Sequence, residues 1–399
     1  MNGARRVVYL SPTAQLGGAE QSLLDLAAAL DRGRYLPGLV CLDEGPLLAS
    51  AARRGITVER VAMPHSFART SLRGRRSSGI ELGLAALRAL PTATALGRVV
   101  RRGGAALVHS NGNKTHALSL RLALSPVPIV WHVRDFLPSR APERMLLRMG
   151  AAVGVTLIAN SAAVASHLHN LGVAREGVHT IVNGIDIVRF HPEGPRVDLR
   201  AELGWPASTR VVGMVGVLAR WKGQEVFLRA VRQIADRALD VRFAVVGGEL
   251  YRTRGHGGFE AGLRALTHEL GLNGVVGFTG HRDDVPGVLR GLDVVVHASI
   301  EPEPFGRVIA EAMACARPVV WARGGGADEI VGDGGLTALG VAPGDEQALA
   351  CAIMRALDEP EAARRWAREG RQRIASGFDL ARHLQRVQDL YDRLTAGRA

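Results

Sequence analysis

Short apolar runs alternate with helical stretches along the whole chain. "RVVYLS" at residues 6–11 precedes the helical pattern "AEQSLLDLAAALDR" at residues 19–32, and "VRFAVVGG" at residues 241–248 shows that the same kind of run returns in the second half. Buried parallel strands have this continuous apolar character, and parallel strands are joined by helical crossovers. The alternation therefore predicts parallel sheets covered by helices.

A linker divides the alternation into two halves. "VHTIVNGIDIVRFHPEG" at residues 178–194 contains the turn signal Asn183-Gly184, and Pro192 and Pro195 punctuate the segment that follows. The chain of 399 residues is too long for one ordinary core, so we predict two Rossmann-like domains with a cleft between them. The predicted bounds are residues 1–184 for the N-terminal domain, 185–377 for the C-terminal domain and 378–399 for an amphipathic C-terminal helix.

The charge balance favours an anionic partner. Lysine and arginine together number 50 and the acidic residues 38, which gives a net charge of +12, and only Lys114 and Lys222 are lysines. Acidic lipid or a phosphorylated substrate would suit this charge, but a coding bias that raises arginine everywhere explains it equally well. Nucleic acid is disfavoured, because aromatic residues make up only 5% and are not interleaved with basic ones.

Cysteine use and hydropathy predict a cytoplasmic setting. Cys41, Cys315 and Cys351 are far apart and form no CxxC pair, so neither a disulfide framework nor a zinc site is expected. No stretch approaches the about 20 apolar residues of a membrane-spanning helix. We expect a cytoplasmic protein or one peripheral at the inner face of the cell membrane. Residues 71–104, basic at both ends with an apolar middle broken by Pro91, suit an anionic membrane surface or, equally, packing on a core.

The most informative motif is "SIEPEPFGRVIAEAMACARPVV" at residues 299–320. Pro304 is expected to begin a helix, because proline suits the first helical turn. The amides of residues 305–307 would then bind an anion, and Glu311 could accept hydrogen bonds from a diol, with Glu303 in the preceding loop. A nucleotide sugar presents such a phosphate between hydroxyl-bearing groups. The alternative is a glutamate-rich helix start without a ligand, since carboxylates stabilise helix N-termini.

The segment "EPFGRVIAEAMA", in which seven residues separate Glu303 from Glu311, resembles the signature of the retaining nucleotide-sugar glycosyltransferases of family four. The resemblance implies the GT-B fold, in which two Rossmann-like domains face each other across a central cleft. It also implies an acceptor-binding N-terminal domain, a donor-binding C-terminal domain, and a C-terminal helix that packs back towards the N-terminal domain. Further segments that resemble the family, in its order, are "LGGAE" (16–20), "WHVRDF" (131–136), "IANS" (158–161), "VNGID" (182–186), "GQEVFLRA" (223–230), "GFTGHRDDV" (277–285) and "GGADEIV" (325–331).

The resemblance implies a role for each motif residue. Glu311 would bind the nucleotide ribose, while Glu303 and the amides of residues 305–308 would address the donor sugar and its diphosphate. Gly17 and Gly18 would bring N–H groups to the diphosphate from the opposite domain, at a strand-to-helix turn that also suits anion binding. The implied donor-binding residues are Gly17, Gly18, Arg220, Lys222, Arg282, Glu303, Pro304, Phe305, Gly306, Arg307, Val308 and Glu311.

Lys222 in "LARWKGQE" is the implied cationic clamp on the diphosphate. A compact ammonium on a flexible stem approaches a diphosphate as a point charge, and arginine's planar fork has a different geometry. The family has an arginine directly after the glycine that corresponds to Gly216, but Val217 stands there in this chain. Arg220 either replaces that arginine or binds elsewhere. Arg282 lies in "GHRDD", a loop that in the family cups the base.

Polar residues close several predicted strands of the first half. His109, Asn111, His132 and Ser161 each end an apolar run, and ligands bind at the carboxyl ends of strands in open α/β sheets. The resemblance implies that His132 contacts a donor-sugar hydroxyl at the reaction centre, although a lone histidine after a strand is more often structural. The acceptor-side candidates, for which a capping or turn role is an equal alternative, are Asn111, Lys114, Arg134 and Asp135.

The resemblance implies a retaining, metal-independent hexosyltransferase, and we favour a UDP-sugar over a GDP-sugar as its donor. Its partners would be this co-substrate, a hydroxyl acceptor in cell-surface glycan or lipid-linked saccharide biosynthesis, and an anionic membrane surface, with no cofactor, no metal and no nucleic acid. The predicted catalytic residues are His132, Lys222 and Glu303. The alternatives are a soluble enzyme for a small secondary metabolite, a non-catalytic nucleotide-sugar-binding protein and a GT-B epimerase.

Overall fold

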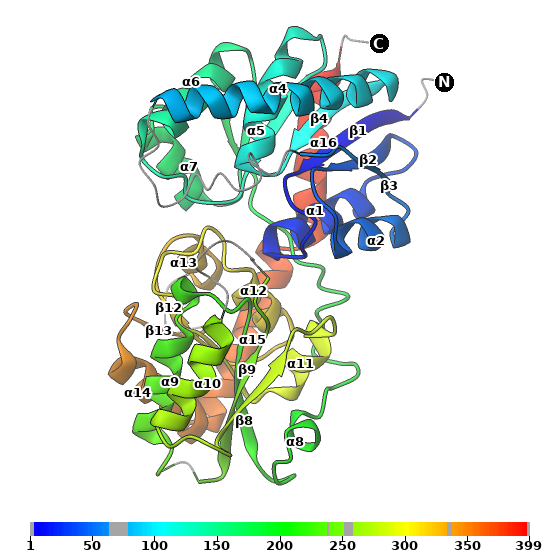
Figure 1. Cartoon of the computed structure of the whole chain (residues 1–399). Helices are drawn as coiled ribbons and strands as arrows, with labels where there is room; N and C mark the ends of the chain where they lie inside the picture. Colours follow the sequence, from blue (N-terminus) through cyan, green and yellow to red (C-terminus); the bar gives the residue numbers. More distant parts are fainter. Residues whose placement is uncertain (1–3, 64–78, 238, 251–257, 333–336, 397–399) are drawn as a thin grey trace. The chain divides into compact units, whose positions relative to one another are not determined.

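The structure is a computed structural model that describes residues 4–63, 79–237, 239–250, 258–332 and 337–396 (Figure 1). The chain forms two compact units, passing from unit 1 to unit 2 after Asn183 and returning to unit 1 after Leu380. The predicted boundaries, after residues 184 and 377, lie within a few residues of these positions. The first part of the predicted basic segment, residues 71–78, lies outside the described residues.

Unit 1 contains a seven-stranded parallel sheet with the order β3-β2-β1-β4-β5-β6-β7. The strand order reverses between β1 and β4, which makes the carboxyl ends of these strands the switch point at which ligands bind in such sheets. The strands are β1 (Arg5–Ser11), β2 (Tyr35–Cys41), β3 (Thr57–Arg60), β4 (Ala105–Ser110), β5 (Ile129–Val133), β6 (Thr156–Ala159) and β7 (Val178–Thr180). The helices are α1 (Gly18–Ala29), α2 (Pro46–Arg53), α4 (Gly79–Arg102), α5 (Asn113–Ser119), α6 (Ala141–Ala152), α7 (Ala162–Asn170) and α16 (Leu380–Thr395), with short 3₁₀ turns η1 (Leu120–Leu124) and η2 (Arg175–Gly177).

Each face of this sheet has its own apolar layer, because successive side chains of a strand point to opposite faces. Val8 of β1 belongs to the cluster that includes α4, α5, α6 and α7, whereas Tyr9 belongs to the cluster that includes α1, α2 and α16. The last helix, α16, contributes Val387 and Tyr391, both fully buried, and is the predicted C-terminal helix (red in Figure 1). The chain returns to unit 1 after Leu380, and α16 thus completes the core of this unit.

Pro91 does not interrupt α4, which runs without a break from Gly79 to Arg102. Pro91 is exposed, and so is Leu87, whose carbonyl the proline ring displaces. A carbonyl on the solvent side of a helix can turn to water, which lowers the cost of the missing hydrogen bond.

Unit 2 contains a six-stranded parallel sheet with the order β10-β9-β8-β11-β12-β13. Two parallel sheets, each covered by helices, confirm the predicted fold class. The strands are β8 (Arg210–Val215), β9 (Val241–Val246), β10 (Val276–Gly280), β11 (Val294–His297), β12 (Val319–Ala322) and β13 (Leu339–Val341). The helices are α8 (Leu199–Glu202), α9 (Gln224–Ile234), α10 (Phe259–Glu269), α11 (Val285–Gly291), α12 (Arg307–Ala314), α13 (Gly326–Val331), α14 (Glu346–Asp358) and α15 (Pro360–Gly377), with the 3₁₀ turn η3 (Arg220–Lys222).

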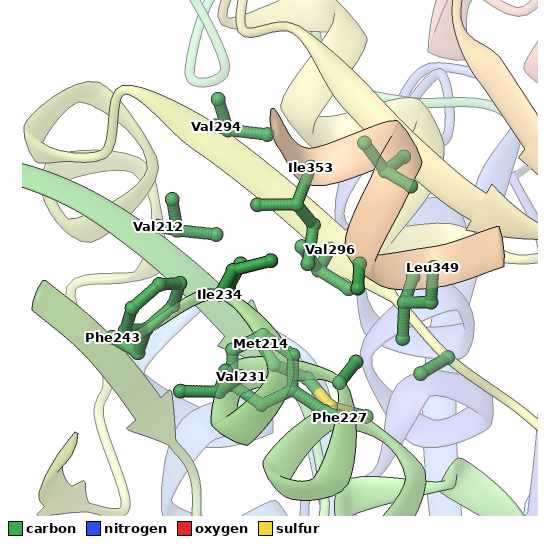
Figure 2. Packing of buried hydrophobic residues seen from close by; sticks show 14 of the residues in the cluster. Val212, Met214, Phe227, Val231, Ile234, Phe243, Val294, Val296, Leu349 and Ile353 are labelled. Atoms are coloured by element: carbon green, nitrogen blue, oxygen red, sulfur yellow. The ribbon is translucent and has the colours of Figure 1, made fainter. Parts of the chain in front are cut away.

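The core of unit 2 lies between the sheet and helices α9 and α14 (Figure 2). Phe227, Val231 and Ile234 recur at helical spacing on α9 and pack with Met214 of β8 and Ile353 of α14, all at most 5% exposed. Burying a side chain of this size stabilises the fold by about 1.5–3 kcal/mol. The well-packed helices give the carboxyl ends of β8 and β11 a rigid support.

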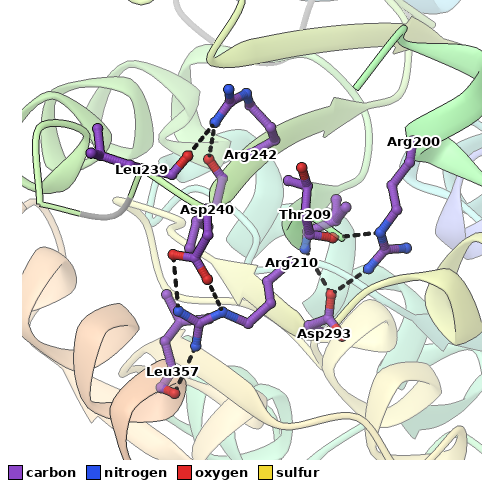
Figure 3. A network of polar contacts seen from close by, with 10 residues as sticks. Arg200, Thr209, Arg210, Leu239, Asp240, Arg242, Asp293 and Leu357 are labelled. Atoms are coloured by element: carbon purple, nitrogen blue, oxygen red, sulfur yellow. Dashed lines mark hydrogen bonds and ion pairs between the residues drawn. The ribbon is translucent and has the colours of Figure 1, made fainter. Parts of the chain in front are cut away.

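Arginine ion pairs hold the opposite, amino-terminal ends of these strands (Figure 3). Arg210 bonds to Asp240 and to the carbonyl of Leu357, and Arg200 bonds to Asp293 at 2.8 Å. Asp293 also accepts the backbone N–H of the residue after Arg210 at 2.7 Å. Part of the chain's arginine content therefore serves the fold and is unavailable to a partner.

Candidate active site

Four polar side chains gather at the carboxyl end of β11 in unit 2, and we call them the Lys222–Glu303 cluster. Lys222 donates from Nζ to Glu303 Oε1 at 2.5 Å, although 81 residues separate the two. Ser299 donates to the same oxygen at 2.6 Å, and His297 Nε2 lies 3.1 Å from it. The side chains of Lys222 and Glu303 are 22% and 12% exposed, so a ligand can reach both.

Glu303 is ionised in this cluster. Burial acts to raise the pKa of its carboxyl, but the Lys222 ammonium and the hydrogen bond from His297 outweigh burial and hold that pKa well below its usual range. A carboxylate only accepts hydrogen bonds, so His297 donates through Nε2–H. The other ring nitrogen, Nδ1, is buried without a hydrogen-bond partner in the described part of the chain.

Close backbone approaches set the positions of Lys222 and Glu303. Gly223 has φ 76°, and a Cβ there would lie 1.9 Å from the carbonyl oxygen of Ala298, so only glycine lets the Lys222 turn lie against the end of β11. The backbone of Glu303 is held by Gly326, whose N–H donates to the Glu303 carbonyl at 2.7 Å. A Cβ on Gly325 would lie 2.3 Å from that carbonyl oxygen. Both charged residues therefore sit on backbone with little freedom to move.

Helix α12 begins at Arg307, three residues later than the predicted start at Pro304. Gly306 precedes the helix in the left-handed conformation, with φ 89° and ψ 51°, which residues other than glycine rarely adopt. The first N–H groups of a helix have no acceptor within it, so the amides of Arg307 and Val308 can meet an anion. Glu311 lies one turn further and is buried, and its Oε1 accepts from Arg307 Nε at 2.6 Å. Phe305 is also buried, so its side chain is a packing group.

Two arginines predicted to bind the donor lie outside the Lys222–Glu303 cluster. Arg220 is exposed, bonds to Glu225 at 3.4 Å and lies over the ring of Phe259. Arg282 is held by the carboxylates of Glu202 and Asp284 at 2.7 and 2.8 Å, which raises the pKa of its guanidinium. Their assignment to the donor stays a prediction.

A second polar group in unit 1, the histidine cluster, consists of the buried side chains of His109, His132 and Tyr391 and the half-buried Arg134. His109 Nε2 lies 3.1 Å from His132 Nδ1, and His109 Nδ1 lies 2.6 Å from the hydroxyl of Tyr391. Arg134 approaches His132 Nδ1 with a guanidinium nitrogen at 3.1 Å. The rings come together because β4 and β5 are neighbours and α16 covers their face.

Arg134 joins the histidine cluster to two asparagines at strand ends. It donates to the side-chain oxygens of Asn111 at 2.5 Å and Asn183 at 2.7 Å. Burial, and then the charge of Arg134, lowers the pKa values of His109 and His132 well below 6.5, so both rings are neutral at ordinary pH. His132 Nε2 is buried without a hydrogen-bond partner among the residues described.

The glycine loop "LGGAE" leads into α1 in unit 1. Gly17 caps the helix and its carbonyl accepts the N–H of Gln21, so the amides of Gly18 and its neighbours lie in the first turn. Their role in binding an anion stays a prediction. Glu20, to which the sequence analysis gave no role, is 6% exposed, and burial raises its pKa. Its Oε2 has no hydrogen-bond partner in the described ranges.

A cavity of about 890 Å³ opens in unit 1 at the carboxyl ends of β1, β2 and β3, beside α4. Lys114 at the start of α5 lines it, and burial lowers the pKa of the Lys114 ammonium while Asp43 acts to raise it. Asp135 is half-buried beside Arg134 and does not line this cavity. The charged lining residues are Asp43, Glu59, Arg60, Arg98, Arg102 and Lys114.

Several polar residues of the two clusters were not predicted as site residues from the sequence. His297 and Ser299 both lie in "DVVVHAS", where polar residues following an apolar run were a usable signal. Asn183 was used only as a turn marker, and Tyr391 only as an apolar position of the last helix.

No group of three or more histidine, cysteine or acidic side chains that could hold a metal occurs in the described ranges. None of the helices described is both long and apolar enough to cross a bilayer.

Two family models match consecutive parts of the chain. "Glycosyltransferase Family 4" matches residues 16–189, and "Glycosyl transferases group 1" matches residues 196–373. A D-inositol 3-phosphate glycosyltransferase of Corynebacterium jeikeium is 41% identical over 169 residues, 41% of this chain and 39% of that protein. A 2-deoxystreptamine glucosyltransferase of Streptomyces kanamyceticus is 32% identical over 244 residues, 60% of each chain. The matches thus span 39–60% of the length of these curated relatives.

A solved structure is similar over nearly the whole chain. Alr3699/HepE of Anabaena, crystallised in complex with UDP-glucose, has a TM-score of 0.81 and 27% identity, covering 97% of this chain and 99% of that one. The two family models meet at the linker between units 1 and 2, and the structural match spans both units. The chain therefore belongs to the family-4 type glycosyltransferases of the GT-B fold.

Proposed function

We propose that this protein transfers a hexosyl group from a UDP-sugar to a hydroxyl acceptor with retention of configuration. The observation that carries the proposal is the Lys222–Glu303 pair at the carboxyl end of β11, just before the first amides of α12. A cation and the first amides of a helix suit a diphosphate, and buried Glu311 suits a ribose diol. UDP is favoured over GDP because Alr3699/HepE, 27% identical, was crystallised with UDP-glucose.

The chemistry of such a step is dominated by charge on the leaving group. When the bond to the sugar breaks, negative charge develops on the diphosphate, and Lys222 with the α12 amides would stabilise it. Glu303 would stabilise the sugar as it becomes cation-like, and His132 would orient a sugar hydroxyl. The departing diphosphate would take the acceptor proton on the same face. The step requires neither a metal nor a cofactor besides the nucleotide sugar, so we propose none.

The cavity of unit 1 favours an acceptor that carries an anionic group. Its charged lining has four cationic and two acidic side chains, and Arg102 pairs with Glu59 at 2.8 Å. The lining therefore holds more cationic than acidic groups. Of the acceptors named for the relatives, an inositol phosphate fits this charge and a cationic aminocyclitol does not. A phosphate-bearing lipid-linked saccharide or an acidic cell-surface glycan shares the same chemistry.

Donor binding tests the proposal directly. We expect UDP and UDP-sugars to raise the melting temperature, because a ligand at 100 times its Kd adds about 2.7 kcal/mol, or roughly 5–10 °C for a unit of this size. GDP and GDP-sugars should shift it less. Incubation with the stabilising UDP-sugar and an anionic hydroxyl acceptor should then release UDP and form a glycosylated product. NMR should show that the anomeric configuration of the product is the same as that of the donor sugar.

The outcomes separate the alternatives. A melting temperature unmoved by any nucleotide would contradict the proposed function, whereas a shift without UDP release, with or without acceptor, would favour a non-catalytic binding protein. Turnover of an uncharged small metabolite in preference to every anionic acceptor would favour the secondary-metabolite enzyme. Loss of UDP without a glycosylated product would indicate an epimerase-type reaction.

A further inference from the structure

The hydrogen bonds of the histidine cluster have only one consistent set of donors. A guanidinium has donors and no acceptor, so Arg134 must donate to His132 Nδ1, which is therefore unprotonated. Because His132 is neutral, its proton is on Nε2. Arg134 thus favours the Nε2–H tautomer of His132 from one side of the ring.

The same logic passes through His109 to α16. The short contact between His109 Nε2 and His132 Nδ1 needs one proton, and His132 Nδ1 has none, so His109 donates from Nε2–H. Neutral His109 then has a bare Nδ1, which accepts the hydroxyl proton of Tyr391 at 2.6 Å. The Tyr391 oxygen is left to accept from Tyr9, whose hydroxyl lies 3.2 Å away. Every polar atom of this chain of bonds is satisfied except His132 Nε2–H.

We propose that Tyr391 is a positioning residue that acts through His109 to hold His132 in its Nε2–H form, so that His132 only donates a hydrogen bond to an oxygen of the substrate. His132 Nε2–H is buried and lacks a partner among the described residues, which is costly unless a ligand accepts from it. A histidine in this tautomer cannot take the acceptor proton through Nε2, so it is not the base of the reaction. This inference rests on the proposed function, in which His132 meets the donor sugar.

Contacts of α16 with the sheet of unit 1 hold Tyr391 in position. Its ring lies edge-on to Tyr35, 5.7 Å between centroids, and the Tyr35 hydroxyl bonds to Asp392 at 2.6 Å, one residue further along α16. Asp392 also pairs with Arg5 at 3.0 Å. These anchors fix the rotation of α16, so the Tyr391 hydroxyl can reach His109 and nothing else in the described ranges but Tyr9.

The test compares Tyr391→Phe with Tyr35→Phe, since each removes one hydroxyl from the same aromatic pair. Only Tyr391→Phe removes the hydroxyl that donates to His109 Nδ1. Without this donor, His109 and His132 should populate a second tautomer as well. The ¹⁵N spectra of histidine-labelled protein distinguish protonated from bare ring nitrogens. In Tyr35→Phe, Arg5 and Arg34 still pair with Asp392 and hold α16 in place. We expect wild type and Tyr35→Phe to show His132 protonated at Nε2 alone, and Tyr391→Phe to show a mixture. A single, unchanged tautomer in Tyr391→Phe would overturn the proposal.

Kinetics test whether the effect passes through His132. Losing the oriented donor should lower kcat/KM for the donor about tenfold in Tyr391→Phe. In a His132→Ala background, the same substitution should cost nothing further, whereas a purely structural role would add its full cost again. His109→Gln, whose amide N–H can replace Nε2–H, should retain more activity than His109→Leu. A wild-type protein without transfer activity would contradict the proposed function, and the spectra would still decide the tautomer.

Discussion

Lys222 is chemically distinct in a chain whose other cations, apart from Lys114, are arginines. Its ammonium is fixed 2.5 Å from Glu303 by a turn in which Gly223 touches the carbonyl of Ala298. The two charges stabilise each other without a ligand, and the diphosphate would share the ammonium once bound. An arginine would bring a planar fork in place of this compact point charge.

At this scale we predict that Lys222→Ala and Glu303→Gln each lower kcat by roughly 10²–10³-fold, since both remove charge aimed at the transition state. Steady-state UDP release measures the change, and circular dichroism checks that each variant is folded. Arg229→Ala is the control, because Arg229 is 48% exposed on α9 and bonds only loosely, at 3.6 Å, to Glu346. Turnover near the wild-type rate in both cluster variants would contradict their assignment as catalytic residues.

The sequence could indicate Lys222 and Glu303 singly, but not their contact. Glu303 came from the motif and Lys222 from its rarity, and a contact across 81 residues depends on how β11 and the turn before α9 come together. His297 and Ser299 complete the cluster from a strand end that the sequence analysis recognised only as a strand. Local pattern fixes which residues end a strand, whereas the partner strand decides what they face.

At the scale of elements, the start of helix α12 is set by packing and not by the local preference of proline for a first helical turn. Proline preference placed the start of α12 at Pro304, but the helix begins at Arg307. A Cβ on Gly326 would lie 2.3 Å from the Pro304 carbonyl, so this stretch is pressed against the neighbouring loop and turns into the helix only at Gly306. That arrangement puts the first helical amides at Arg307 and Val308, a few residues after Glu303.

The short strands β3, β7 and β13 were not predicted. β3 is "TVER", largely exposed at the sheet edge, and β7 and β13 have three residues each. An edge strand buries one side at most, so it lacks the continuous apolar run that marked the inner strands. The inner strands and the amphipathic helices, which bury the most surface, were the elements that the sequence predicted well.

The cavity between the strand ends and α4 is an element-scale site, since the ends of three strands and two helices contribute to it. We predict that Arg98→Glu and Lys114→Ala raise KM for an anionic acceptor about tenfold or more, because each removes or reverses a charge near the bound anion, while KM for the UDP-sugar stays constant. Arg53→Glu, the same charge change as Arg98→Glu on exposed α2 and away from the cavity, is the control. Equal effects of Arg53→Glu and Arg98→Glu would show that only net charge matters.

For the molecule as a whole, the net charge of +12 has two sources that can be separated. Some arginines are used internally, as Arg200 and Arg210 are, and carry no information about a partner. Others lie on one exposed surface of α4, where Arg88 stands between Leu87, 63% exposed, and Leu90, 44% exposed. Exposed leucines beside arginines are the composition of helices that lie at a membrane surface.

We therefore predict binding to vesicles that contain phosphatidylglycerol and not to vesicles of phosphatidylcholine alone, measured by co-sedimentation. Binding should weaken between 50 and 500 mM salt, because the screening length falls from over 10 Å to a few ångströms and each surface cation contributes about 1 kcal/mol. The double substitution Leu87→Ser and Leu90→Ser should reduce the vesicle binding that remains at high salt. Arg88→Glu should reduce the vesicle binding that is lost as salt rises. Vesicle binding that is absent at low salt would make the arginine content a matter of coding bias and of internal ion pairs, and would favour an acceptor that is free in solution.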